Sequence, residues 1–442
     1  MMNHTRRSFV LLALMLGLLF ALPAVAGTLM AGAAVADITP DPAYQLPSSG
    51  YGQRKGTPMT GVHDPIKCKA LALNDGQGQV AIVTCDMVMI TPEFRGKVLA
   101  QLAGAGFDAN NVLMAASHTH SGPGAMMNNF ISNLAFGRYN DKYTQEAADR
   151  TAAAIQKARE GMKPATLRFS ETRLEDLTRN RRDPAGSYNY DTRRFSSAYD
   201  PKNPRNDVDP TLTVLRVDGE DGKPIAILFH FPTHGTVMGA DNLRFSADWM
   251  GAAMAKLEAA YPGAVALYLN GAQGDQAPTM LTDQRTDWEY VDYIGGKVAD
   301  GVMSIMDKTV AVNASPIRSV LIRREIPAGD RVMGIWVGKA FVGHYFPDLA
   351  LMGVRIGEVG LMACPVEMVS EVGRTMKEGA RGQGVKYPLV VGLANEHMLY
   401  TASPYDFPDG GYEVENTVYG PTEAAILIGE ELMIMNRLFA AE

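Results

Sequence analysis

Short apolar runs alternate with helix-patterned runs along the whole sequence after residue 26. Apolar runs of four to eight residues fit buried strands, and apolar residues spaced three and four apart fit one face of a helix. No linker rich in proline, glycine or serine clearly divides the sequence, and we find no internal repeat. The pattern predicts an α/β or mixed α+β fold, with mixed β-sheets flanked by helices.

The first clear helix start is Thr91-Pro92-Glu93, which supplies an N-cap, a proline at the first helical position and an early acid. We expect further helices over residues 143–162, 247–260, 289–306, 366–377 and 422–438. We expect strands over residues 112–116, 212–217, 225–231, 264–269, 319–324, 359–363 and 389–393. Residues 179–205 show no period, and a loop of that length in a compact domain is more often functional than idle.

Composition excludes several classes of protein. The chain has 442 residues, 46% of them hydrophobic and 20% charged, which is typical of a globular protein long enough for one large domain or two ordinary ones. Its formal net charge of −7 argues against a nucleic-acid partner. No Gly-x-Gly-x-x-Gly, Walker or Gly-x-Ser-x-Gly pattern is present, so neither nucleotide binding nor a serine nucleophile is favoured. The 25 methionines are first interpreted as core residues and second as the lining of an apolar groove.

Residues 1–26 have the three parts of a secretory signal peptide. Arg6 and Arg7 precede an apolar run that is too short to span a bilayer, and Ala24-Val25-Ala26 forms a cleavage site before Gly27. We therefore predict export to the periplasm or the medium, with cleavage after Ala26. Both the general and the twin-arginine export routes fit. The alternative is an N-terminal membrane anchor that stays in place.

The cysteines leave two interpretations open. Only three are present, so they cannot form a disulfide framework. The turn over residues 74–79 predicts a hairpin that brings Cys68 and Cys85 about opposite each other. A disulfide between them is geometrically feasible, and two buried thiols fit at least as well. Cys364 has no obvious partner.

The sharpest local motif is His118-Thr119-His120-Ser121-Gly122-Pro123-Gly124, directly after an apolar strand. In an extended chain, residues i and i+2 point to the same side, so both imidazoles can reach one metal ion. The alternative is a pair of hydrogen-bonded surface histidines at a turn.

A second pair, His230 and His234, lies at the end of another predicted strand. The chain has only eight histidines, so this clustering favours a shared site in which about three protein ligands hold a catalytic zinc. His230 also fits a buried core position. Residues 270–278 form a further strand-to-loop junction, and Glu367 is expected at the start of a helix, whose dipole would keep it ionised.

In their order along the chain, these motifs resemble those of the neutral (non-lysosomal) ceramidases, zinc enzymes that hydrolyse the amide of ceramide. The resemblance spans about residues 33–440. Its most specific part is the His-Thr-His-Ser-Gly-Pro-Gly run. The other matching stretches are Ala33 to Pro40, Gly61 to Pro65, Phe231 to His234, Gly274-Asp275, Pro365 to Glu367, Gly392 to Asn395, Tyr412-Glu413 and Tyr419 to Pro421.

The resemblance implies a role for each matching residue. Zinc would be held by His118, His234, Glu367 and Tyr400, and His120 would act as an acid/base or orienting group beside it. Arg181 and Tyr412 would contact the scissile amide and its oxyanion. The loop with Gly274, Asp275, Ala277 and Thr279 would bind substrate.

The sequence departs from the family at two points. Where the family has Gly-Asp-x-Ser-Pro-Asn, this chain has Ala277 in place of the serine, and Thr279 is a partial substitute. The sequence ends at Glu442, so we expect no immunoglobulin-like C-terminal domain. We accordingly divide the chain into a signal peptide, residues 1–26, and a zinc hydrolase domain, residues 27–442.

The leading hypothesis is an exported zinc amidohydrolase that acts on ceramide or a related N-acyl lipid, with transient contact with a membrane surface. One alternative is a hydrolase of another N-acyl compound or an ester at the same site. The other is a catalytically weak zinc protein that binds lipid or glycan at the cell envelope.

Overall fold

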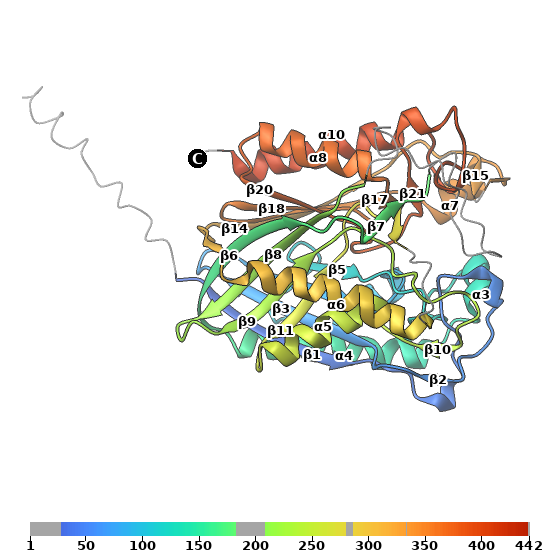
Figure 1. The fold of residues 1–442 in the computed structure, drawn as a ribbon. Helices are drawn as coiled ribbons and strands as arrows, with labels where there is room; N and C mark the ends of the chain where they lie inside the picture. Colours follow the sequence, from blue (N-terminus) through green and yellow to red (C-terminus); the bar gives the residue numbers. More distant parts are fainter. Residues whose placement is uncertain (1–27, 183–207, 280–285, 333, 441–442) are drawn as a thin grey trace, which may run out of the picture.

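Two β-sheets stacked face to face form the centre of the molecule, with helices on both outer faces (Figure 1). The computed structural model describes residues 28–182, 208–279, 286–332 and 334–440. The predicted signal peptide and most of the segment 179–205 lie outside these residues. In the described part, no helix has both the length and the apolar character needed to cross a membrane.

The larger sheet has the strand order β11-β9-β8-β6-β1-β3-β4-β5, and β13 also pairs with β6. Its strands are β1 (Met30–Asp37), β3 (Lys67–Asn74), β4 (Gln79–Cys85), β5 (Val112–Ala116), β6 (Lys163–Arg173), β8 (Thr211–Gly219), β9 (Pro224–His230), β11 (Val265–Leu269) and β13 (Val310–Ala311). The smaller sheet has the order β14-β17-β18-β20. Its strands are β14 (Ile317–Arg324), β17 (Leu349–Ile356), β18 (Val359–Ala363) and β20 (Tyr387–Val391).

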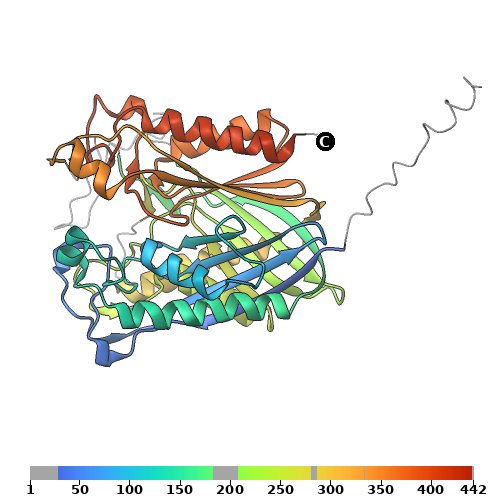
Figure 2. The same ribbon diagram turned by 180° about the vertical axis from the view of Figure 1, so that it is seen from behind.

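Helices cover the outer face of each sheet, as both views show (Figures 1 and 2). On the larger sheet these are α2 (Pro92–Gln101), α4 (Asp141–Glu160), α5 (Asp248–Ala260) and α6 (Asp287–Met306). On the smaller sheet they are α8 (Ser370–Gly382) and α10 (Glu423–Phe439). The shorter helices are α3 (Phe130–Phe136), α7 (Lys339–Tyr345) and α9 (Tyr412–Glu415).

The two-residue period of the strands explains the layers. Along β3, Ala70 and Ala72 pack into the core under α2 and α4, whereas Leu71 and Leu73 pack into the core between the two sheets. Strands buried on both faces appear in the sequence as continuous apolar runs, which is why β5 and β18 could be predicted. The predicted α/β class with mixed sheets is confirmed.

The predicted hairpin is also confirmed, with Cys68 opposite Cys85 in the β3–β4 register. The two cysteines form a disulfide, which resolves the alternatives that the sequence left open. Cys364 is a buried free thiol.

One predicted boundary is wrong. The helix expected from residue 366 begins at Ser370, and Glu367 instead lies in the short strand β19 (Glu367–Met368). This strand pairs in parallel with β21 (Tyr400–Thr401). A pairing partner 33 positions away in the sequence leaves no local pattern, so the helix start could not be located from residues 364–367 alone.

Candidate metal centre

The site lies where parallel strand pairs of both sheets end. The pairs β4–β5, β9–β11 and β18–β20 are each parallel. Side chains that follow the carboxyl ends of such strands gather at one edge of a sheet. The two histidine segments, one after β5 and one after β9, are joined directly: Thr119 and Gly235 form a bridge, and the His120 amide donates to the Gly235 carbonyl at 3.0 Å.

His118 is held in an unusual backbone conformation. Its φ is +67°, a region that non-glycine residues rarely adopt. The amide of His118 donates to the Met87 carbonyl at 2.9 Å, and Nδ1 lies 2.7 Å from the Val88 carbonyl oxygen. A carbonyl oxygen only accepts hydrogen bonds, so Nδ1 carries a proton and, in the neutral imidazole, Nε2 presents a lone pair.

His234 has the same arrangement. Its Nδ1 lies 2.9 Å from the Gln273 carbonyl oxygen and 2.8 Å from that of Gln276. Burial lowers the pKa of His234 to about 4, so the ring is neutral at pH 7. Its Nε2 therefore also presents a lone pair toward the centre.

The Glu367 carboxylate meets both lone pairs. Its Oε2 lies 3.0 Å from Nε2 of His118 and 3.1 Å from Nε2 of His234, and no hydrogen-bond donor among the described residues reaches this oxygen. Burial acts to raise the pKa of Glu367, whereas the hydrogen bond that His397 donates to Oε1 acts to lower it. Three electron-pair donors that face one another in a buried space repel unless a cation lies between them. The donor set therefore fits a metal ion such as zinc.

His120 completes a group of three imidazoles with His118 and His234, whose nitrogens lie within 4.8 Å of one another. Nε2 of His120 is 3.2 Å from Nε2 of His118, and its Nδ1 has no partner in the described part of the chain. Gly50, with φ +100°, packs so closely on the ring that a Cβ would lie 2.5 Å from the His120 Cγ. Burial, together with His118 and His234, holds the pKa of His120 well below its usual value.

Tyr400 comes into the site through the pairing of β21 with β19, which places it opposite Glu367. Its hydroxyl lies 3.3 Å from Nε2 of His234 and accepts a hydrogen bond from Nη2 of Arg181 at 2.9 Å. Burial raises the pKa of Tyr400 well above its usual value. An adjacent cation would lower that pKa and allow the phenol oxygen to act as a ligand.

Arg181 and Tyr412 lie on the other side of Tyr400. The Arg181 guanidinium lies 5.0 Å from the Tyr412 ring centre and donates from Nε to Glu413 Oε1 at 2.7 Å. Glu413 is buried, and its Oε2 also accepts a hydrogen bond from Nη1 of Arg182 at 2.9 Å. This double ion pair fixes the arginine that faces the site.

Comparison with known proteins identifies the family. Residues 29–289, more than half of the chain, match the family described as "Neutral/alkaline non-lysosomal ceramidase, N-terminal". The chain belongs to the neutral/alkaline non-lysosomal ceramidase family. It is 22% identical to neutral ceramidase A of Dictyostelium discoideum, over 88% of this chain and 70% of that protein. It is 23% identical to the neutral ceramidase of Pseudomonas aeruginosa, over 89% of this chain and 70% of that protein.

The fold agrees with this membership. The crystal structure of neutral ceramidase from Pseudomonas aeruginosa superposes with a TM-score of 0.82 at 20% identity, over 93% of this chain and 74% of that one. At this identity the likeness shows a common ceramidase-family fold, and the assignment of roles rests on the residues of this chain.

The structure brings together seven of the sequence-predicted site residues: His118, His120, His234, Glu367, Tyr400, Arg181 and Tyr412. The predicted reason for an ionised Glu367 is wrong, because the residue lies in β19 and not at a helix start. His230 belongs to the core: its side chain is buried and its Nε2 lies 2.8 Å from the Val390 carbonyl oxygen.

In this ceramidase-family chain, the predicted substrate loop is hydrogen-bonded to the segments that carry Arg181 and Glu367. The Asp275 carboxylate accepts hydrogen bonds from the Ser370 amide at 2.7 Å and from Asn180 Nδ2 at 2.8 Å, and its carbonyl accepts the Arg181 amide. Gly274 donates its amide to the Met368 carbonyl, directly after Glu367.

Ala277 lies in β12 (Gln276–Pro278), which pairs with β7 (Thr178–Asn180), and Thr279 follows it with its amide bonded to the Leu177 carbonyl. The Gln276 carbonyl accepts a hydrogen bond from Nδ1 of His234, so this strand lies next to the candidate metal centre.

Three functional contacts escaped the sequence reasoning: His397 on Glu367, and Glu413 and Arg182 around Arg181. His397 stands three positions before Tyr400, and the scarcity of histidine in the chain was the one available signal.

Proposed function

We propose that this chain is an exported, zinc-dependent amidohydrolase that cleaves the N-acyl amide of ceramide or a related N-acyl lipid. The observation that carries the proposal is the convergence of His118, His234 and Glu367 lone pairs in a chain of the ceramidase family. Tyr400 is the fourth proposed ligand. When bound, zinc lowers the pKa of a water to about 7 and so supplies hydroxide at neutral pH.

The remaining residues suit the other requirements of amide hydrolysis. The nucleophilic water must lose a proton and the leaving amine must gain one, and His120 is placed to transfer it because its Nε2 faces the centre, 3.2 Å from Nε2 of His118. Negative charge develops on the carbonyl oxygen, and Arg181 can donate to it from Nη2 while Glu413 holds the guanidinium in place. Tyr412 is the second proposed donor.

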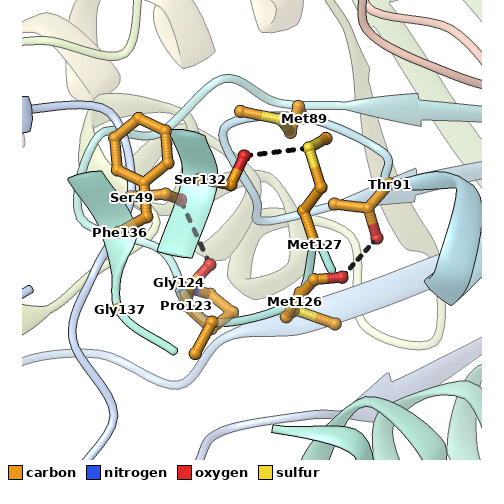
Figure 3. A pocket seen from close by; sticks show the side chains of 11 residues that line it. Ser49, Met89, Thr91, Pro123, Gly124, Met126, Met127, Ser132, Phe136 and Gly137 are labelled. Carbon is orange, nitrogen blue, oxygen red and sulfur yellow. Dashed lines mark hydrogen bonds between the residues drawn. The ribbon is translucent and has the colours of Figure 1, made fainter. Parts of the chain in front are cut away.

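A small apolar pocket also lies beside the turn that follows His120. The pocket lies between α3 and the Gly-Pro-Gly turn, lined chiefly by Met89, Met126, Met127 and Phe136 (Figure 3). Its polar side chains are internally paired: Ser49 Oγ donates to Pro123 O at 3.1 Å, for example. Its cavity volume of about 20 Å³ is room for about one water molecule, so the pocket does not itself hold an acyl chain.

A substrate panel tests the proposal. The purified protein lacking residues 1–26 is loaded with zinc and incubated with ceramide, N-acyl amino acids and a lipid ester, while His118→Ala serves as the blank. We expect release of fatty acid from ceramide or another N-acyl lipid, and loss of release by at least about 10²-fold in the variant. Turnover of the ester alone favours the esterase alternative, and bound zinc without turnover of any substrate supports the binding-protein alternative.

Export is proposed from residues 1–26 alone. Expression of the full chain in a Gram-negative host, with fractionation and N-terminal sequencing, should give a periplasmic or secreted product that begins at Gly27. A full-length product in the membrane fraction would instead support a retained anchor.

A further inference from the structure

A fourth histidine touches the candidate metal centre from outside. Nε2 of His397 lies 3.0 Å from Oε1 of Glu367, the carboxylate oxygen that points away from His118 and His234. The His397 side chain is only 6% exposed. Since an ionised carboxylate only accepts hydrogen bonds, His397 donates through Nε2.

The loop that carries His397 is built around the Glu367 backbone. The amide of Leu393 donates to the Val366 carbonyl at 3.2 Å, and the amide of Met398 donates to the Pro365 carbonyl at 2.6 Å. In return, the Glu367 amide donates to the Leu399 carbonyl at 2.8 Å. The imidazole and the carboxylate are therefore held in register by main-chain bonds on both sides of the contact.

The same loop contains an unusual concentration of left-handed backbone. Leu393, Asn395 and Leu399 have φ values of +56°, +66° and +59°. Each such residue costs on the order of 1 kcal/mol or more, and this strain persists where the surrounding structure enforces it, commonly at functional sites. All three strained residues lie in the seven-residue segment 393–399, which contains His397.

We propose that His397 is a positioning residue that fixes the Glu367 carboxylate so that Oε2 alone faces the ion. This inference rests on the proposed zinc dependence. With Oε1 bonded to His397, the carboxylate cannot rotate to offer both oxygens, and its one free lone-pair site stays aligned with Nε2 of His118 and His234. Outer hydrogen bonds of this kind raise metal affinity by about 10- to 100-fold.

The test measures zinc affinity directly, by competition with a chromophoric chelator, for the parent, His397→Ala and His397→Gln. Glutamine keeps an N–H donor, so it should retain most of the affinity that alanine loses. For His397→Ala we expect a zinc dissociation constant 10- to 100-fold higher than that of the parent, with kcat reduced and KM for the lipid little changed. His344→Gln, on the exposed side of α7, is the matched control and should behave like the parent.

The outcomes separate this inference from the proposed function. If the parent binds no zinc, the proposed function and this role both fail. If the parent binds zinc and His397→Ala binds it equally well, only the positioning role fails. Should the alanine variant not fold, His397→Leu replaces it, because leucine fills the space without a donor: a 10- to 100-fold loss of zinc affinity in His397→Leu, with the affinity kept in His397→Gln, supports the role, and parental affinity in His397→Leu overturns it.

Discussion

At the scale of single residues, the site depends on which nitrogen of each histidine is free. Main-chain carbonyls accept hydrogen bonds from Nδ1 of His118 and His234. In the neutral rings, the two Nε2 atoms therefore have no proton to donate to Glu367. This arrangement explains the choice of histidine and glutamate together.

Ala277 stands where the sequence resemblance implies a serine. It lies on β12 beside Gln276, whose carbonyl holds His234. A serine hydroxyl here would restore a hydrogen bond to substrate, worth about 0.5–1.5 kcal/mol. Ala277→Ser should therefore raise kcat/KM on ceramide by about two- to tenfold, measured by fatty-acid release.

The control for that substitution is Ala311→Ser, which is exposed on β13 and should leave kcat/KM unchanged. A folded Ala277→Ser protein with unchanged or lower kcat/KM would show that substrate does not contact this position.

Part of this site could be predicted from the sequence. Local patterns indicate His118, His120 and His234 as site residues, because all three follow predicted strands and the first two are spaced two apart. Tyr400, Arg181 and Tyr412 could be named only through the family resemblance, because a lone tyrosine or arginine carries no local signature. Glu413 was out of reach as an anchor for Arg181, because the two residues are 232 positions apart.

At the scale of elements, strand pairing positions the ligands and helix α10 locks the pairing. Thr401, in β21, donates its hydroxyl to the Glu423 carboxylate at the start of α10, and the Tyr419 amide donates to the other oxygen at 3.3 Å. Glu423 therefore joins the helix to the strand that holds Tyr400. Periodicity predicted the helix and the buried strand runs well, whereas β19 and β21 are two-residue strands too short to leave a pattern.

Glu423 gives a pH prediction. Burial raises its pKa to about 8, although the Thr401 and Tyr419 hydrogen bonds act to lower it. The folded state therefore keeps a proton that the unfolded state releases near pH 4.5, so the free energy of unfolding should fall as pH rises from about 4.5 to 8. Glu423→Gln mimics the protonated acid and should remove this contribution.

Urea unfolding at pH 6 and pH 8.5 measures the effect. Glu423→Gln should be more stable than the parent at pH 8.5 by about 1 kcal/mol or more, with a smaller difference at pH 6. Glu378→Gln, exposed on α8, is the control and should not alter the pH dependence. An identical fall in the free energy of unfolding for the parent and Glu423→Gln would show that protonation of Glu423 does not cause the pH dependence.

At the scale of the whole molecule, exposed apolar side chains gather at one end. Phe130 and Leu134 on α3 are 72% and 71% exposed, and Ile335 and Trp336 on β16 (Ile335–Trp336) are 67% and 69% exposed. Both views place α3 and the β15 (Arg331–Val332) hairpin with α7 at the same end (Figures 1 and 2). The hairpin is bonded to α9, because the Gly334 amide donates to the Glu415 carbonyl at 2.7 Å.

We infer that this end contacts the membrane surface from which a lipid substrate is taken. The double variant Leu134→Ser/Trp336→Ser should weaken binding to phosphatidylcholine vesicles, measured by sedimentation, by at least about 30-fold, because two large apolar contacts of about 1–3 kcal/mol each are lost. Turnover of a short-chain soluble substrate should be unchanged.

Met433→Ser, exposed on α10, is the control for apolar surface elsewhere. Equal vesicle binding by the parent and the double variant would contradict the contact surface without affecting the metal centre.

The proposed function requires one zinc ion, held by His118, His234, Glu367 and Tyr400, for cleavage of an N-acyl lipid. The direct measurement is the rate of ceramide hydrolysis as the metal-free protein is titrated with zinc. We expect a rate that rises to a plateau at one zinc per chain, and no such rise for His118→Ala. A metal-free protein that hydrolyses ceramide as fast as the zinc-loaded one would contradict it.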